Sequence, residues 1–210
     1  MLRLYLVRHG QTAWNEVGRI QGHSDVPLDA VGLRQAEQTA RWLAETLPNP
    51  QGVYTSDLQR AAQTAEAIAR ALNRPLYPEP RLRERFWGDW EGLTLDEVRE
   101  RYPDQHLTYL YDPIHGTPPN AEPMEAFWER VRDFAHTLFK THAEGDWVIV
   151  GHGGSLRIIL CEVLAGDVQT YRRIRLDNTS ISIVEHTGER VYVALLNSTV
   201  HLQDPSVDGF

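Results

Sequence analysis

The sequence predicts an α/β fold: a three-layer sandwich in which a mainly parallel sheet carries helices on both faces, with a small cap insertion. Three observations support this class. Apolar runs of strand length alternate with longer segments whose apolar residues recur every three or four positions. Two of the apolar runs end in a histidine next to glycine, and one stretch rich in proline and aromatic residues interrupts the alternation. We therefore expect functional residues at the carboxyl ends of the strands, where sheets of this kind bind ligands.

The first part of the chain alternates strand and helix. Residues 2–7 (LRLYLV) form an almost continuous apolar run, as expected of a strand buried on both faces. Asp29 is expected to cap a helix over residues 30–47, which two nearby prolines end. Residues 52–55 indicate a brief second strand, and Ser56 is expected to cap a second amphipathic helix of similar length.

The rest of the chain contains the predicted cap and then returns to the alternating pattern. The periodicity is weak from residue 73 to 120, and we interpret residues of about 74–121 as a cap inserted into the fold. The elements expected within and after it are a short helix at 94–101, a loop at 108–120, a long helix at 122–142, a strand at 147–150, a helix at 155–164 and a pair of strands at 180–184 and 191–196. We expect residues 1–210 to form a single domain with a flexible tail from about residue 204.

Composition limits the classes of function. Of the 210 residues, 41% are hydrophobic and 24% are charged, which is ordinary for a globular protein. A net charge of −8 argues against a nucleic-acid partner, because binding to the phosphate backbone depends on basic side chains. No apolar run approaches the roughly 20 residues of a membrane helix, and residues 1–7 are too short for a signal-peptide core. The sequence thus favours a cytoplasmic protein with no membrane partner.

Two predicted strands end in histidine next to glycine. His9 lies between Arg8 and Gly10, and His152 lies just before Gly153 at the start of a helix. Glycine lets backbone N–H groups approach an anion closely, and the amino end of a helix favours negative charge. Either histidine alone would more commonly be a structural residue satisfied by backbone hydrogen bonds, but the pair at equivalent positions predicts an anion pocket.

Six segments in a fixed order make the chain resemble the histidine phosphatase superfamily, which includes cofactor-dependent phosphoglycerate mutase and many small-molecule phosphatases. The matching segments are LVRHGQTAWN (6–15), GRIQG (18–22), PLDAVGLRQA (27–36), YTSDLQRAAQTA (54–65), LRERFWGDWEGLT (82–94) and VGHGGSLR (150–157). The resemblance covers nearly the whole chain and implies a phosphoglycerate mutase-like fold.

The resemblance implies a role for each of five residues. His9 would be the nucleophile that becomes phosphorylated, with Arg8, Arg60 and His152 around the phosphoryl oxygens and Glu84 as the proton donor. The chemistry is sound, since a neutral imidazole held by an acceptor is a good nucleophile and the arginines would neutralise the phosphoryl charge. The aromatic residues that follow Glu84 would desolvate its carboxyl group and so favour the protonated form.

Each of these roles has a simpler alternative. An arginine near the start of an exposed helix, as Arg60 is expected to be, is usually a solvated charge. Glu84 lies between two arginines and could form a surface ion pair, while Glu91 is the competing carboxylate. Asn15 and Gln21 would donate neutral hydrogen bonds to the phosphoryl group or, equally well, stabilise a turn.

Departures from the family's pattern bear on specificity. A Gly-Glu-Ser turn that is frequent in the family is replaced by Ala121-Glu122-Pro123, and Trp87 stands where a phenylalanine is usual. In the cap, Tyr109 and Tyr111, together with His115, are expected to contact the organic part of the substrate. No residue between 102 and 120 is Lys or Arg, although the glycolytic mutases carry a basic insertion in the cap.

The sequence therefore predicts a metal-independent phosphatase that hydrolyses a small phosphorylated metabolite through a phosphohistidine on His9, with no cofactor. Two alternatives remain at this stage: a phosphoglycerate mutase that transfers the phosphoryl group between substrate hydroxyls, and a non-catalytic module that binds a phosphorylated ligand or a protein. The strand pair at the end of the chain offers a sheet edge at which a homodimer could form.

Overall fold

A single six-stranded sheet forms the centre of the molecule. The computed structural model describes residues 1–112 and 116–202. The strands are β1 (Leu2–Arg8), β2 (Pro50–Thr55), β3 (Leu76–Pro78), β4 (Gly145–Gly151), β5 (Ile181–His186) and β6 (Val191–Ser198). Their order is β3-β2-β4-β1-β5-β6, and β5 is antiparallel to both of its neighbours while β1 to β4 pair in parallel. The predicted α/β class with a mainly parallel sheet is confirmed.

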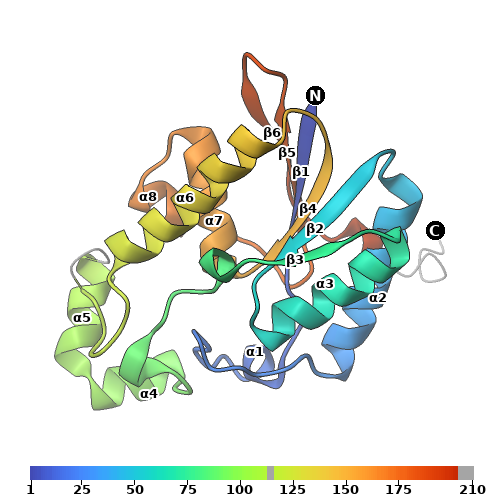
Figure 1. Cartoon of the computed structure of the whole chain (residues 1–210). Coiled ribbons are helices and arrows are strands. Elements are labelled where there is room, and N and C mark those ends of the chain that lie inside the picture. Colours follow the sequence, from blue (N-terminus) through green and yellow to red (C-terminus); the bar gives the residue numbers. More distant parts are fainter. Residues whose placement is uncertain (113–115, 203–210) are drawn as a thin grey trace, which may run out of the picture.

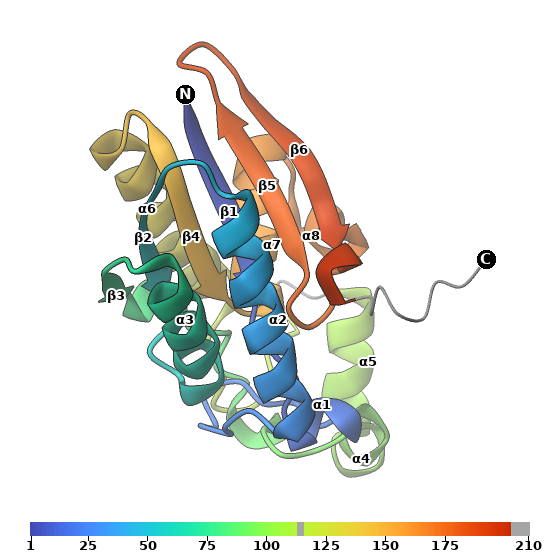
Figure 2. The same cartoon turned by 90° about the vertical axis from the view of Figure 1, so that its right-hand side faces the viewer.

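Helices cover both faces of this sheet (Figures 1 and 2). The α-helices are α1 (Ala13–Glu16), α2 (Ala30–Thr46), α3 (Gln59–Leu72), α4 (Leu95–Arg101), α5 (Pro103–Tyr111), α6 (Met124–Thr141), α7 (Gly153–Leu164) and α8 (Val168–Arg173). Short 3-10 turns lie at Pro80–Leu82, Gly88–Trp90 and Val200–Leu202. Helices α2 and α3 lie on one face of the sheet, and α6 and α7 lie on the other.

The alternation of side chains along β1 divides the core into two layers. Leu2, Leu4 and Leu6 are buried against α6 and α7, whereas Tyr5 and Val7 are buried against α2 and α3. Successive side chains of a strand point to opposite faces, so an apolar residue at nearly every position lets one strand serve both layers. This is why the continuous apolar run at the start of the chain predicted a central strand.

Most element boundaries agree with the sequence, and Asp29 caps α2 through a hydrogen bond from the Gly32 N–H (2.7 Å). Ser56 does not cap α3, because the helix begins only at Gln59 and the preceding Leu58 makes no side-chain cap. The backbone of Ser56 still continues the sheet, with its N–H donating to the Val150 carbonyl (3.1 Å). Its hydroxyl accepts from the N–H of Leu58 (3.3 Å) and keeps its own proton for another partner.

In the described residues, the structure adds three α-helices and one strand that the sequence did not predict: α1, α5, α8 and β3. Helix α5 covers only the first four residues of the expected loop, 108–111, and it buries no residue, so it has no apolar stripe to reveal it. Strand β3 has only three residues and lies at the edge of the sheet, and the short α8 also buries no residue. Elements with little buried surface leave no periodic signal in the sequence.

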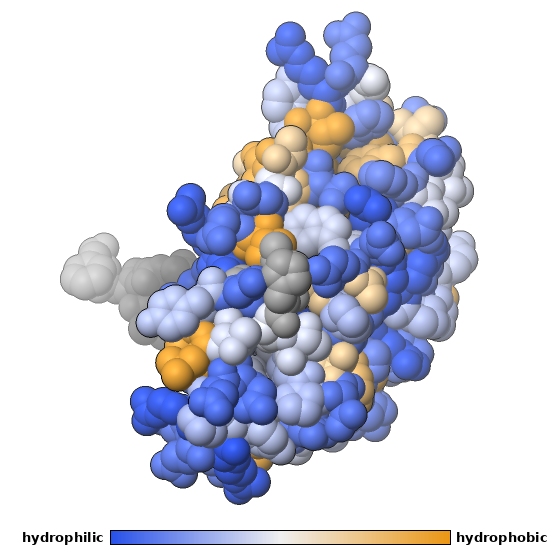
Figure 3. All heavy atoms as spheres, turned by 90° about the vertical axis from the view of Figure 1, so that its left-hand side faces the viewer, coloured by the Kyte–Doolittle hydropathy of each residue, from blue (hydrophilic) through white to orange (hydrophobic). Residues whose placement is uncertain are grey.

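The cap lies beyond the carboxyl ends of β1, β2 and β4, where α4 and α5 extend from the sheet (Figure 1). The surface on that side of the molecule is mostly hydrophilic, with apolar side chains in separate patches (Figure 3). In the described parts of the chain, none of the helices has the length and apolar character needed to cross a membrane. The expected tail and His115 lie outside the described residues.

Candidate active site

Strand register brings the two predicted histidines together. Arg8 is paired with Gly151 across β1 and β4, and Thr55 is paired with Val150 across β2 and β4. The His9 N–H donates to the Gly151 carbonyl (3.0 Å), so the chain leaves both strands at the same level. The ring centroids of His9 and His152 are 5.1 Å apart, with both residues buried.

Hydrogen bonding fixes which nitrogen of His9 is reactive. Its Nδ1 lies 2.7 Å from the carbonyl oxygen of Gly10, an acceptor that requires a proton on Nδ1. Burial, together with the charges of Arg60 and Arg8, lowers the pKa of His9 well below its ordinary value of 6.5. The ring is therefore neutral near pH 7, with its Nε2 lone pair available for attack on an electrophile.

His152 is hydrogen-bonded through the other ring nitrogen. Its Nε2 lies 2.8 Å from the hydroxyl of Ser56, which is the partner that the end of β2 supplies. Its Nδ1 is buried and has no hydrogen-bond partner in the described structure. Burial and the nearby Arg60 charge lower the pKa of His152 as well. When Nε2 accepts from the serine hydroxyl, Nδ1 carries the proton and can donate it in a hydrogen bond to a ligand.

Two arginines, the buried Arg60 and the half-buried Arg8, flank the histidines. Arg8 donates from Nη1 to the Leu176 carbonyl (2.6 Å), and Arg60 donates to the carbonyls of Ser24 (2.9 Å) and Gly22 (2.7 Å). The Nε of each arginine is buried and has no acceptor among the described residues. Burial lowers the pKa of Arg60 to about 10, which still leaves it charged at neutral pH. Arg60 is 1% exposed, so it is not a solvated surface charge.

These groups line one polar cavity of about 250 Å³. Seven of the expected site residues form part of its wall: Arg8, His9, Asn15, Gln21, Arg60, Glu84 and Gly153. His152 lies directly behind the wall, against the ring of His9. Segments separated by more than a hundred residues therefore contribute to one site.

Glu84 is fixed by backbone donors. One carboxylate oxygen accepts from the N–H of Gly154 (2.8 Å) at the start of α7, and the other accepts from the N–H of Arg85 (2.8 Å). A Cβ on Gly154 would lie 2.0 Å from Glu84 Oε1, so this approach requires glycine. The expected aromatic enclosure is only partial, because the Phe86 ring packs on His23, with ring centroids 5.4 Å apart.

The alternatives for the carboxylates are resolved by their partners. Arg83 pairs with Asp57 and Arg85 donates to the Glu122 carbonyl (2.8 Å), so neither forms an ion pair with Glu84. Glu91 instead accepts hydrogen bonds from backbone N–H groups of His23 (2.7 Å), Ser24 (2.9 Å) and Trp87 (3.1 Å). Glu91 thus joins two loops of the cavity wall.

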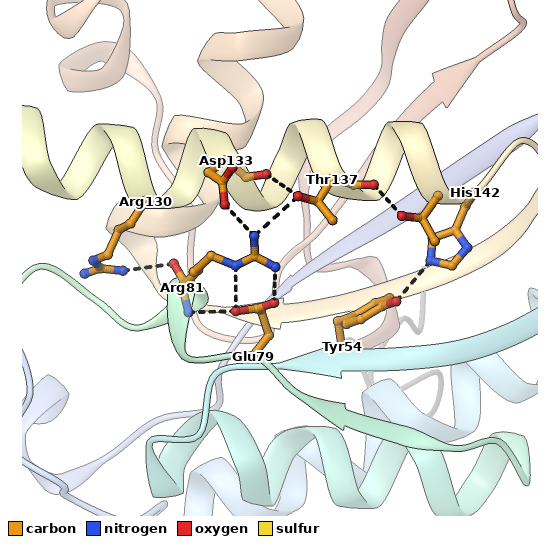
Figure 4. A network of polar contacts seen from close by, with 8 residues as sticks. Tyr54, Glu79, Arg81, Arg130, Asp133, Thr137 and His142 are labelled. Atoms are coloured by element: carbon orange, nitrogen blue, oxygen red, sulfur yellow. Dashed lines mark hydrogen bonds and ion pairs between the residues drawn. The ribbon is translucent and has the colours of Figure 1, made fainter.

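Arg130 of α6 holds the segment that carries Glu84. Its guanidinium donates to the carbonyls of Arg81 (2.9 Å), Arg83 (2.8 Å) and Glu84 (2.7 Å). Figure 4 shows the first of these bonds beside the Glu79–Arg81 ion pair. Glu122, the residue retained in the altered turn, closes the arrangement by pairing with Arg130 (2.7 Å).

Asn15 and Gln21 stabilise a turn and also line the cavity. The side-chain oxygen of Asn15 accepts from the N–H of Thr12 (3.1 Å), and that of Gln21 accepts from the Thr12 hydroxyl (3.0 Å). Their amide nitrogens have no acceptor within the described residues, and both side chains line the cavity. Asn178 completes the turn by donating to the carbonyl of His9 (3.0 Å).

Three expected substrate contacts are not brought to this cavity. Tyr111 is 86% exposed on α5, and Tyr109 packs edge-on against Trp87 and Trp90 behind the cavity wall. The N–H of Gly10 donates to the Thr64 hydroxyl (3.1 Å) and is not available to an anion. A Cβ at Gly10 would lie 2.6 Å from the Gly32 carbonyl oxygen, so this glycine serves the contact between β1 and α2.

Besides two glycines, Gly22 and Gly154, the cavity is lined by four residues to which the sequence analysis gave no role: Arg19, Ile20, Arg157 and Tyr171. A signal existed for Arg157, because it follows Gly153 by four residues and so lies on the same face of α7. Tyr171 belongs to the unpredicted α8, so no pattern pointed to it.

Comparison with known proteins places the chain in a family. A sequence model of the histidine phosphatase superfamily (branch 1) matches residues 4–199. Phosphoserine phosphatase 1 of Hydrogenobacter thermophilus is 32% identical over 209 residues, which are 100% of this chain and 98% of the relative. A protein of Serratia proteamaculans named "Probable phosphoglycerate mutase GpmB" is 33% identical over 216 residues, or 99% and 98% of the two chains.

Structural similarity agrees with the sequence match. The crystal structure of the α-ribazole phosphatase from Shigella flexneri superposes with a TM-score of 0.85 at 29% identity, and the match covers 93% of this chain and 96% of the other. The chain belongs to the histidine phosphatase superfamily, and its fold is phosphoglycerate mutase-like.

Proposed function

We propose that the protein is a phosphatase that hydrolyses a small phosphorylated metabolite through a phosphohistidine on His9. The observation that carries the proposal is a set of buried nitrogens in, and directly behind, the wall of the cavity that His9 lines. Arg8 Nε, Arg60 Nε and His152 Nδ1 come from three separate elements, and none has an acceptor within the described structure. Buried polar groups are nearly always hydrogen-bonded, so this arrangement fits a phosphoryl group that accepts from all three.

In the first half of the reaction, Nε2 of His9 attacks phosphorus with its lone pair and the bond to the leaving oxygen breaks. Glu84, in its protonated form, gives its proton to that oxygen, which leaves as an alcohol. Arg8, Arg60 and His152 donate hydrogen bonds to the three equatorial oxygens, whose charge is greatest in the transition state. The arginines are fixed by backbone carbonyls beforehand, so little reorganisation is needed.

In the second half, water attacks the phosphohistidine and the phosphorus–nitrogen bond breaks, which returns the electron pair to Nε2. Glu84, now a carboxylate, accepts the proton of the attacking water. Inorganic phosphate then leaves. Every proton is accounted for by Glu84 and water, so the proposal requires neither a cofactor nor a metal ion.

The composition of the cap favours hydrolysis over phosphoryl transfer to a second hydroxyl. Among residues 102–120, none is Lys or Arg, so this part of the cap supplies no cation to hold a second anionic acceptor. A mutase reaction is distinguished by supplying 3-phosphoglycerate and following whether the phosphoryl group reaches it or water. A non-catalytic module would bind phosphorylated ligands without turnover across the same compounds.

The test of the proposal is hydrolysis of p-nitrophenyl phosphate by the wild-type protein in the presence of EDTA. We expect activity that His9→Ala lowers by at least about 10³-fold, since the nucleophile is lost. His136→Ala is the matched control, because that side chain is 59% exposed on α6, outside the cavity. Full activity in His9→Ala, or its loss on chelation, would refute the mechanism.

We infer that the protein acts in the cytoplasm on a small metabolite. Its net charge of −8 argues against a nucleic-acid partner. Strand β6 lies at the edge of the sheet and carries the exposed side chains of Tyr192 and Leu196, which supports pairing of two copies there. Size-exclusion chromatography with light scattering tests for that dimer.

A further inference from the structure

Arg157 is a cavity residue that the mechanism does not use. It lies on α7, one turn after Gly153, and its side chain lines the cavity. Its Nε is buried with no hydrogen-bond partner, and in the described parts of the chain it forms no ion pair. An arginine that is partly removed from water and left without an acceptor is costly unless a ligand supplies one.

The charges around Arg157 leave it uncompensated. Arg19, which also lines the cavity, is neutralised by Glu97, with 2.7 Å between Nη1 and Oε2. Among the residues of the wall, Glu84 is the carboxylate, and both of its oxygens already accept backbone N–H groups. Arg8 and Arg60 are assigned to the phosphoryl group, so Arg157 adds positive charge beyond what one phosphoryl group requires.

The guanidinium of Arg157 is also held in place. Its Cζ lies 5.5 Å from the centroid of the Tyr171 ring, a cation–π contact that does not occupy its N–H donors. A planar, pre-positioned fork of donors matches the two oxygens of a carboxylate. A second phosphate would bring up to two negative charges to a single guanidinium, which is a poorer match.

We propose that Arg157 binds a carboxylate of the substrate, so that the substrates of this enzyme are small phosphorylated carboxylic acids. The inference rests on the proposed phosphatase function and adds the class of substrate to it. A cavity of about 250 Å³ has room for a phosphoryl group and a carboxylate joined by a few carbon atoms. Trp87 and Tyr171 flank the remaining space.

The experiment compares substrates that differ only at the proposed carboxylate. O-phosphoserine is paired with O-phosphoethanolamine, and 3-phosphoglycerate is paired with glycerol 3-phosphate. We expect wild-type kcat/KM to favour each carboxylate by about tenfold or more, which is the scale of a charge-assisted hydrogen bond. Arg157→Gln should abolish that preference, because it should raise KM for the carboxylate member of each pair more than for its partner.

Two further variants control for charge and folding. Arg173→Gln removes the same charge from an exposed position on α8 outside the cavity, and it should keep the preference for carboxylates. Arg157→Lys keeps the charge but loses the fork, so it should retain only part of the preference. Binding of O-phosphoserine and O-phosphoethanolamine to His9→Ala, with and without Arg157→Gln, measures the same discrimination by calorimetry without turnover.

The outcomes separate this inference from the proposed function. If p-nitrophenyl phosphate is hydrolysed through His9 but Arg157→Gln weakens both members of each pair equally, Arg157 serves the phosphoryl group and the carboxylate proposal is wrong. If no phosphate ester is hydrolysed, the phosphatase proposal fails. In that case, equal binding of O-phosphoserine and O-phosphoethanolamine would also overturn the role of Arg157.

Discussion

The carboxyl ends of β1 and β4 look alike in sequence, since each presents a histidine followed by glycine, yet the structure gives them different chemistry. At the end of β1, Nδ1 of His9 is hydrogen-bonded to the Gly10 carbonyl, and Nε2 is available to a ligand. At the end of β4, Nε2 of His152 is hydrogen-bonded to the Ser56 hydroxyl, and Nδ1 has no partner among the described residues. The partner of one nitrogen decides whether the other attacks or donates.

The glycines at the two ends differ in the same way. Gly10 is required because a Cβ would collide with the backbone of α2, whereas Gly154 is required because a Cβ would collide with the Glu84 carboxylate. The end of β1 is therefore part of the packing of the core, while the end of β4 holds the carboxylate that we propose as the proton donor. One shared motif can thus meet a packing constraint at one strand and position a candidate catalytic group at the next.

The largest expected effect separates the two histidines. His152→Ala removes a donor to the phosphoryl oxygens, so kcat should fall by about 10² to 10³-fold while a phosphorylated His9 still forms. His9→Ala should form no phosphoenzyme at all. Rapid quench with a radiolabelled substrate measures both, and phosphorylation of His152 in place of His9 would reverse the assignment.

Substitutions at the glycines test whether the two strand ends have different constraints. Gly154→Ala should lower kcat/KM by about tenfold to a hundredfold, because the new methyl group displaces Glu84 from its position. Gly153→Ala should cost less, since the nearest atom, Arg8 Nε, is 3.8 Å from the added Cβ. Gly10→Ala should instead reduce the free energy of unfolding by about 1–3 kcal/mol through overpacking.

Denaturant titration and steady-state kinetics distinguish these outcomes. A Gly10→Ala variant of unchanged stability would show that α2 can move aside. Equal kinetic losses in Gly153→Ala and Gly154→Ala would show that the position of Glu84 is not what Gly154 protects.

The smallest expected effect concerns pH and stability. Both histidines have folded-state pKa values well below the ordinary 6.5, so the unfolded chain binds more protons as the pH falls below that value. Stability should therefore decrease on acidification from about pH 6.5 downward, by at most about 1.4 kcal/mol per pH unit for each histidine. His152→Gln should lower the slope by one such increment, and an unchanged slope would contradict the buried neutral state.

Much of the site could be predicted from the sequence because its reactive residues lie in short motifs next to predicted strands and helices. The apolar runs before Arg8-His9 and His152 predicted two strands, and the motifs around Arg60 and Glu84 supplied the remaining groups. The cap could not be predicted in the same way. Tyr109 and Tyr111 were expected at the substrate, but α5 turns one into the wall behind the cavity and the other into solvent.

By itself, the sequence determined the α/β class, the family and the chemical groups of the phosphoryl site. The tertiary structure decided which nitrogen of each histidine is available, why Gly10 and Gly154 are glycines, and that Arg157 reaches the cavity with an Nε that has no hydrogen-bond partner among the described residues. The physical reason is that periodicity reports which side of an element is buried. Hydrogen-bond partners and unpaired charges depend on contacts between segments that are far apart in the chain.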